Sequence, residues 1–171
     1  QKIRQIFPSE QLGPVMRFDP ATSRRNIQMG YYDTMRFMRE LPGQLYYFSE
    51  KADGFAAFAA LPENAIKAAG IPLRLPEGLS PRRALFEHIL PAVAAELRLP
   101  REAGYDDLLL ALLEHRAEQL GIGRFRWYTP AQLQAVIAES TALPEEPRRP
   151  LLRSRPLEAA EILAAALPLL G

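Results

Sequence analysis

The 171-residue sequence contains no cysteine, only two histidines and almost no excess of charge of either sign. Without cysteine the chain forms no disulfide and has no thiolate for catalysis or metal binding, which fits a reducing, cytoplasmic location. A formal net charge of +1 provides no overall attraction for nucleic acid or an anionic bilayer. The longest apolar run, residues 162–170, includes a proline and is far shorter than the roughly 20 residues of a membrane-spanning helix. We therefore predict no transmembrane segment.

The remaining composition is that of an ordinary folded protein, with 48% hydrophobic and 24% charged residues. A chain of this length can bury one sizeable core. The sequence begins at Gln1 without the basic and apolar segments of a signal peptide. From the missing initiator methionine we expect a segment of a longer protein.

Residues 1–48 predict a strand–helix–strand segment. The first strand covers residues 3–7 and ends at a proline, and the second covers residues 44–48. Between them, Thr22 or Ser23 is expected to cap a helix that starts near residue 24. One buried face of this helix is predicted to comprise Ile27, Tyr31, Met35, Met38 and Leu41.

Residues 49–143 predict a helical domain. Helices are expected over residues 52–61 and 63–69, the second ended by Gly70, before a proline-rich loop over 71–79. Ser80 and Pro81 then provide a cap and a first helical residue. The helix that follows is predicted to kink at Pro91.

The strongest helix prediction covers residues 105–120, which are apolar around so much of the helix that it should be central to the core. Another helix is expected from Pro130. Residues 144–155 read as a linker rich in proline and arginine, and residues 156–171 as a C-terminal helix. The fold class predicted is mainly α, a helical bundle with two or three short strands near the N-terminus and around residues 124–128. The strands either pair with one another or belong to a larger sheet.

Residues 3–48 resemble the closing strand and helix of bacterial patatin-like phospholipases. The matching positions are Pro8, Leu12, Gly13, Phe18, Asn26, Gly30, Tyr31, Asp33, Thr34 and Gly43. The resemblance implies an upstream catalytic domain in the same polypeptide that hydrolyses lipid acyl esters without a metal or other cofactor. Members of the family use a Ser-Asp dyad, with the serine in Gly-x-Ser-x-Gly and backbone amides binding the oxyanion.

Neither element of that dyad occurs in this sequence. Ser80 lacks the second glycine of the serine motif and fits a helix cap, and Asp53 departs from the aspartate motif. We therefore assign no catalytic, cofactor-binding or metal-binding residue. The expected role is a non-catalytic C-terminal accessory region that covers or flanks the lipid cleft, cytoplasmic and in contact with a membrane at most peripherally. Alone, the chain is expected to hydrolyse nothing.

Two other patterns offer alternatives. Arg124, Phe125, Arg126 and Trp127 alternate basic and aromatic side chains, an arrangement that can bind single-stranded nucleic acid, although a short edge strand with its arginines in water fits the low net charge better. No nucleic-acid partner is expected. His88 and His115 are expected to be structural. The alternative function is a freestanding helical module that binds a peptide or protein helix in an apolar groove.

Overall fold

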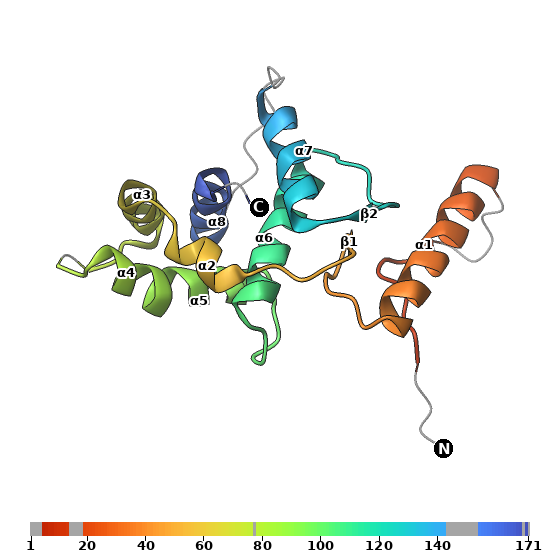
Figure 1. Ribbon diagram of the computed structural model, residues 1–171, viewed down its shortest axis with the longest axis horizontal. Helices are drawn as coiled ribbons and strands as arrows, with labels where there is room; N and C mark the ends of the chain where they lie inside the picture. The colour runs from red at the N-terminus through yellow and green to blue at the C-terminus, as the bar shows by residue number, and fades with distance from the viewer. Residues whose placement is uncertain (1–4, 14–18, 77, 143–153, 169, 171) are drawn as a thin grey trace.

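The computed structural model describes residues 5–13, 19–76, 78–142, 154–168 and 170. The protein is mainly α, as predicted, and the described residues include only two short strands (Figure 1). In chain order the elements are α1 (Pro20–Met38), β1 (Tyr47–Phe48), α2 (Gly54–Ala59), α3 (Glu63–Leu73), α4 (Pro81–Arg83), the π-helical η1 (Ala84–Ile89), α5 (Leu90–Glu96), α6 (Tyr105–Gln119), β2 (Trp127–Tyr128), α7 (Pro130–Ala142) and α8 (Arg155–Ala166).

Helix α1 begins earlier than its sequence predicted. The Asp19 side chain accepts hydrogen bonds from the backbone amides of Ala21 and Thr22, at 2.9 and 3.2 Å. Pro20 occupies the first helical position, where a missing N–H costs nothing. The predicted cap at Thr22 or Ser23 is therefore wrong, since a proline preceded by aspartate makes the stronger helix start.

The predicted buried face of α1 is wrong for three of its five residues, because Ile27, Tyr31 and Met38 are 72%, 56% and 71% exposed. Met35 and Leu41 are half-buried, and the buried residues of the helix are Met29 and Asp33. The apolar spacing is correct for an amphipathic helix. However, no other described element covers that side of α1, which stands apart from the helical bundle (Figure 1).

The two strands form a minimal parallel pair, with Tyr47 opposite Trp127 and Phe48 opposite Tyr128. This confirms that the predicted strand regions 44–48 and 124–128 pair, although each contributes only two residues. The strand predicted over 3–7 is wrong over its described part, because residues 5–7 have no regular structure. Residues 3 and 4 lie outside the described residues.

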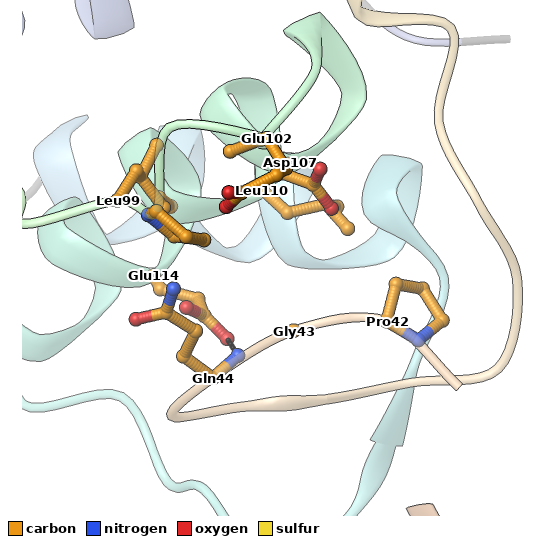
Figure 2. Close-up of a pocket in the computed structure, with 11 residues that line it drawn as sticks. Pro42, Gly43, Gln44, Leu99, Glu102, Asp107, Leu110 and Glu114 are labelled. Carbon is orange, nitrogen blue, oxygen red and sulfur yellow. Dashed lines mark hydrogen bonds between the residues drawn. The ribbon is translucent and has the colours of Figure 1, made fainter. Parts of the chain in front are cut away.

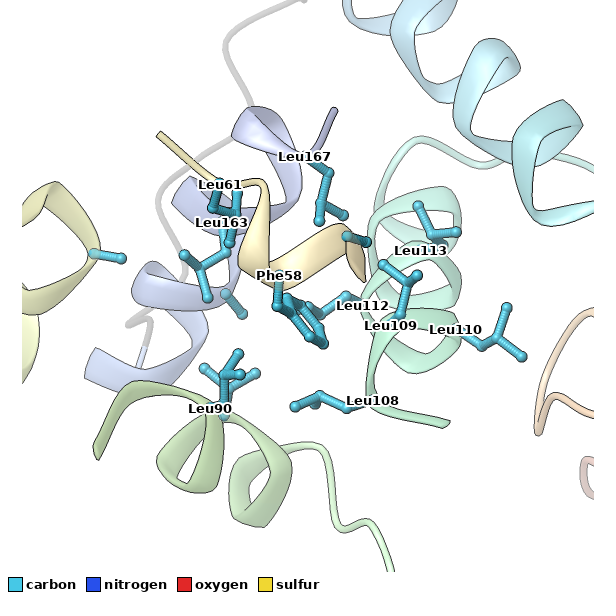
Figure 3. Packing of buried hydrophobic residues seen from close by; sticks show 14 of the residues in the cluster. Phe58, Leu61, Leu90, Leu108, Leu109, Leu110, Leu112, Leu113, Leu163 and Leu167 are labelled. Atoms are coloured by element: carbon cyan, nitrogen blue, oxygen red, sulfur yellow. The ribbon is translucent and has the colours of Figure 1, made fainter. Parts of the chain in front are cut away.

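Helix α6 is central to the core, as predicted from the apolar residues on most sides of this helix. It packs against α2, α7 and α8, and the ring of Phe58 from α2 lies beside Leu109 and Leu112, whereas Leu110 points to the other side of α6 (Figure 3). The buried leucines of α6 are Leu108, Leu109, Leu110, Leu112 and Leu113. Each buried side chain of this size contributes about 1.5–3 kcal/mol. Helix α8 packs on α3 and also contacts α5 and α6, so the C-terminal helix belongs to this core.

The helices on either side of the proline-rich loop differ from prediction. Helix α3 continues past Gly70 to Leu73 and includes Pro72, and it ends at Arg74, which takes the left-handed conformation at φ 53°. Pro91 lies in the first turn of α5, directly after the six-residue π-helical turn η1, and the kink predicted at this proline stays a prediction. Ser80 and Pro81 act as the predicted cap and first residue.

Residues 144–153 of the predicted linker lie outside the described part of the chain. Ser154 is described, and its hydroxyl caps α8. The proposed division at residues 48, 143 and 155 stays a prediction. None of the described helices combines the length and apolar character needed to cross a bilayer.

Candidate functional site

Asp33 is the centre of a polar network where α1 meets the strands. Its Oδ2 accepts the backbone amide of Ser9 at 2.8 Å. Its Oδ1 accepts the Tyr47 hydroxyl and an Arg36 guanidinium nitrogen, both at 3.0 Å. The carboxylate is buried, with 3% of the residue exposed. With three donors already bound, it fixes α1 in place and is not available as a general base.

The Ser9 hydroxyl is the nearest candidate nucleophile, and its partners do not activate it. It accepts a hydrogen bond from Arg124 at 3.2 Å and lies 3.4 Å from the Tyr47 hydroxyl oxygen. Burial raises the pKa of Tyr47, so this phenol stays protonated at neutral pH and serves as a donor. An activated serine needs an adjacent base, and an arginine and a protonated phenol supply none.

The segment over residues 8–13 is fastened along α1. Glu10 forms ion pairs with Arg25 of α1 and with Arg124 of the loop before β2. The Asn26 side-chain amide donates to the Leu12 carbonyl at 3.1 Å. These contacts hold the segment in a defined position without any regular secondary structure.

An aromatic layer joins α1 to the strands. The ring of Tyr32 stacks on Tyr47 with centroids 4.8 Å apart, and lies 5.4 Å from the Trp127 ring and 6.3 Å from the Phe125 ring. The Arg36 guanidinium lies 5.2 Å from the Tyr47 ring centroid. Such ring pairs each add about 0.5–1.5 kcal/mol beyond area burial. The inner side of α1 is thus anchored by rings and by Asp33.

The outer side of α1 carries an exposed apolar stripe. We call Ile27, Tyr31 and Met38 the α1 apolar face, since their spacing places them along one side of the helix, with the small residues Gly30 and Thr34 between them. The N-terminal segment exposes three more large apolar residues, Ile6, Phe7 and Leu12, of which Ile6 and Phe7 lie beside Asp33 and Arg36 and not on this face. Large apolar side chains exposed along one side of a helix are typical of an interaction site.

Glu114 of α6 organises the loop before β1. Its Oε1 accepts the backbone amides of Gln44, Leu45 and Tyr46 at 2.8, 2.9 and 2.8 Å, and Figure 2 shows the first of these hydrogen bonds. Gly43 permits this turn with φ 97°, and a Cβ there would lie 2.8 Å from the Tyr46 carbonyl oxygen. Burial raises the pKa of Glu114, while the three amide donors oppose that rise.

A cavity of about 360 Å³ adjoins this carboxylate, and Glu102 and Asp107 also line it (Figure 2). The Asp107 carboxylate already binds a backbone donor, because its Oδ2 accepts the Gly104 amide at 2.9 Å. Across the described ranges no three acidic or histidine side chains are arranged to hold a metal ion. Because Glu114 already fills its amide nest, the cavity has no donor set prepared for an oxyanion.

The structure brings several family-like residues together. Asn26 and Leu12 share a hydrogen bond, Asp33 is the buried anchor of α1, and Gly43 shapes the Glu114 loop. Gly30 and Tyr31 lie on the exposed side of α1. Pro8 and Gly13 are exposed ends of the fastened segment, Thr34 is half-buried, and Phe18 lies outside the described residues.

The basic and aromatic strip over 124–127 is built into the fold. Arg124 donates to the Leu45 carbonyl at 2.9 Å besides pairing with Glu10, so its side chain is not in water. Phe125 and Trp127 contribute to the aromatic layer, and the Arg126 guanidinium lies 4.7 Å from the Tyr128 ring centroid. This strip presents few free cations to a phosphate backbone.

The other sequence-selected residues have structural positions. Asp53 caps α2 by accepting the Ala56 amide at 2.9 Å, the helix-start role expected of it. His115 contacts Gln119 with nitrogens 3.1 Å apart, and His88 is exposed. Asp33 and Arg36 lie three residues apart on α1, whereas the contacts that bring Ser9 and Tyr47 to Asp33 were not predicted, because they join positions 24 and 14 residues apart.

The sequence contains a signal that Glu114 has a structural role. It is an acidic residue between the buried Leu113 and Ala117 on α6, the helix with five buried leucines. A carboxylate in such a position needs buried donors, because an unpaired buried charge is too costly. The sequence could therefore indicate that donors exist, but not that they are the amides of residues 44–46.

The chain matches no protein-family model, and no curated protein and no solved structure matches it.

Proposed function

We propose that this chain is a non-catalytic accessory region of a patatin-like serine lipid acyl hydrolase, with α1 docked on that enzyme's α/β catalytic domain. The catalytic serine, its aspartate and the oxyanion donors belong to the catalytic domain. In this role the chain covers or flanks the lipid cleft. The enzyme is cytoplasmic and contacts a membrane at most peripherally.

The α1 apolar face carries this proposal. Its three large side chains are more than half exposed, although their spacing is that of a buried helix stripe. Leaving such a stripe in water forfeits about 1.5–3 kcal/mol per side chain, which docking on a matching surface would recover. The Asp33 network and the aromatic layer hold the opposite side of α1, so the helix is presented in a fixed orientation.

The polar chemistry supports a non-catalytic role. The Ser9 hydroxyl has no adjacent base, and the carboxylates of Asp33 and Glu114 are each bound by three donors. Acyl transfer needs a free base beside the nucleophile and preformed oxyanion donors. These side chains are arranged to hold the N-terminal segment in place.

The test is co-purification with the α/β domain encoded directly upstream, which is predicted to contain Gly-x-Ser-x-Gly. Ile27→Asp should abolish co-elution, because it places a charge in the docked face. Gln28→Asp, at the exposed adjacent position of the same helix, is the matched control and should co-elute. Equal co-elution of both variants, or an upstream sequence without a serine elbow, would contradict the proposal.

The exposed face favours one second candidate, a module that binds a separate protein helix. An amphipathic helix can pair with a partner groove through residues at this spacing. In that case Ile27→Asp would lose a helical partner while the upstream domain failed to bind the unmodified chain.

A further inference from the structure

A second apolar surface lies far along the chain from α1. A groove of about 490 Å³ runs between α5 and the start of α6, within the range of roughly 300–1,000 Å³ typical of small-molecule sites. Leu90 and Leu108 extend from the two helices at its base (Figure 3). Neither the Asp33 network nor the α1 apolar face contributes to it.

The walls of the groove are apolar and partly aromatic. Phe86 and Tyr105 meet edge to face at one wall, with ring centroids 5.5 Å apart. Ala94 and Ala95 also line the groove and add only methyl groups to its wall. A groove with such apolar walls suits a flexible hydrocarbon chain better than a polar metabolite.

One cation lies at the groove. Arg101 is the only charged residue among those that line it, and it is exposed. Over the described ranges its guanidinium has no carboxylate partner. A guanidinium binds a carboxylate through two parallel hydrogen bonds, which makes it a natural recognition group for an acid.

The backbone beside the groove is irregular, which is an independent observation. Phe86 belongs to the π-helical turn η1, and Pro91, which also lines the groove, lies two residues after the end of that turn. Pi-helical turns cost hydrogen-bond geometry and occur frequently at functional sites. Here the widened turn and the proline shape one wall of the groove.

We propose that this groove binds a single acyl chain with its carboxylate on Arg101, that is, a free medium- or long-chain fatty acid. The hydrocarbon lies along Leu90, Leu108 and the alanines, and the head group stays at the solvent edge. This site goes beyond the docking role of α1, since it requires no contact with a catalytic domain.

Calorimetric titration of the full chain with octanoate, decanoate and laurate, below their micelle concentrations, tests the chain-length dependence. Each added methylene should tighten binding about fourfold while it lies in the groove. Dodecanol, which has the same chain as laurate without a carboxylate, should bind about tenfold more weakly or worse. Absence of binding, or equal affinity for laurate and dodecanol, would overturn the proposal.

Variants locate the site. Arg101→Gln should remove the preference for laurate over dodecanol, and Arg39→Gln, an exposed arginine at the end of α1, should not. Ala95→Trp should fill the groove and abolish binding of both ligands, and Ala138→Trp on the exposed side of α7 should leave it intact. Wild-type binding by a folded Ala95→Trp protein, checked by circular dichroism, would overturn the proposal.

Two variants distinguish a failure of the fatty-acid proposal from a failure of the docking proposal. Ile27→Asp should lose the catalytic domain and retain laurate, whereas Ala95→Trp should lose laurate and retain the catalytic domain. Loss of laurate binding in Ile27→Asp would contradict a groove between α5 and α6.

Discussion

At the scale of single residues, the Glu114 carboxylate joins two parts of the chain that are about 70 positions apart, by binding the amides of residues 44–46. Glu114→Ala would leave three amide donors without their acceptor at a buried site. Each unsatisfied buried group costs about 1–3 kcal/mol, so the free energy of unfolding should fall by about 3 kcal/mol or more. Urea denaturation measures this difference.

The matched control is Glu118→Ala, an exposed glutamate one turn later in the same helix. This substitution should change the free energy of unfolding by no more than about 0.5 kcal/mol. Equal urea midpoints for the two variants would show that Glu114 does not hold the loop.

Two glycines test close packing at the residue scale. A Cβ on Gly54 would lie 2.0 Å from the Tyr105 carbonyl oxygen, which is a backbone atom, whereas a Cβ on Gly30 would meet nothing within 4 Å. Gly54→Ala should therefore destabilise the chain by about 1–3 kcal/mol or more, because α2 must move away from α6. Gly30→Ala should be neutral or stabilise by up to about 1 kcal/mol, as expected inside an exposed helix.

Thermal unfolding of both glycine variants makes the comparison direct. A lower melting temperature for Gly30→Ala than for Gly54→Ala would contradict the packing of α2 on α6 described above.

Buried phenols predict an alkaline limit to stability. Burial raises the pKa of Tyr46, Tyr47 and Tyr128 above the ordinary value of 10.0. Because the folded chain holds these protons more tightly than the unfolded chain, their contribution is fully present below pH 10. It is lost as the pH rises through 10 toward the folded-state pKa values.

Tyrosinate absorbance during a pH titration measures this effect. The native chain should ionise some of its six tyrosines only at higher pH than the chain in urea does. Tyr46→Phe should reduce the difference in pH between the native and the denatured titration, because one buried phenol is removed. Superimposable native and denatured titrations would contradict the buried positions of the three phenols.

At the scale of elements, α1 behaves differently from every core helix. Ile27→Lys and Met38→Lys should each change the free energy of unfolding of this chain by no more than about 0.5 kcal/mol, because both side chains are already in water. Met29→Ala, on the buried side, should cost about 2–5 kcal/mol. Chemical denaturation distinguishes the two sides, and a large loss in the lysine variants would place the stripe in the core of this chain.

Local signals predicted the elements well where the controlling contacts are close in sequence. Ser80 with Pro81, and the apolar run of α6 with Asp106 and Asp107 in its first turn, are each sufficient to define a helix start. The π-helical turn η1 before Pro91 could not be predicted, because several backbone geometries relieve the missing N–H.

Features set by distant contacts could not be predicted. The spacing of Ile27, Tyr31 and Met38 shows that these residues share one face, but whether that face is covered depends on elements elsewhere. The same limit applies to the candidate site. The segments selected by resemblance contain Asp33, Ser9 and Tyr47, but the resemblance did not indicate that these three residues meet in one network.

At the scale of the whole molecule, the structure combines a closed helical core with an open N-terminal part. Helices α2, α7 and α8 pack on α6, and α3 and α5 pack on α8, so that their apolar residues form one buried cluster (Figure 3). The N-terminal part consists of α1, the fastened segment and a two-stranded parallel pair. A parallel pair of this size is not stable alone, so the aromatic layer and the Asp33 network must support it.

This division explains why the proposed function centres on α1. The helical core needs nothing further to bury its leucines, whereas α1 presents an apolar face on a rigidly held helix. Docking on a lipid hydrolase domain would cover that face and place the helical core beside the lipid cleft.

Hydrogen–deuterium exchange of residues 20–38, in this chain alone and in its complex with the upstream α/β domain, tests the docking of α1 most directly. The account predicts much slower exchange of α1 in the complex, and unchanged exchange in α6, which is already buried. Unchanged exchange throughout α1 in a complex that forms would contradict it.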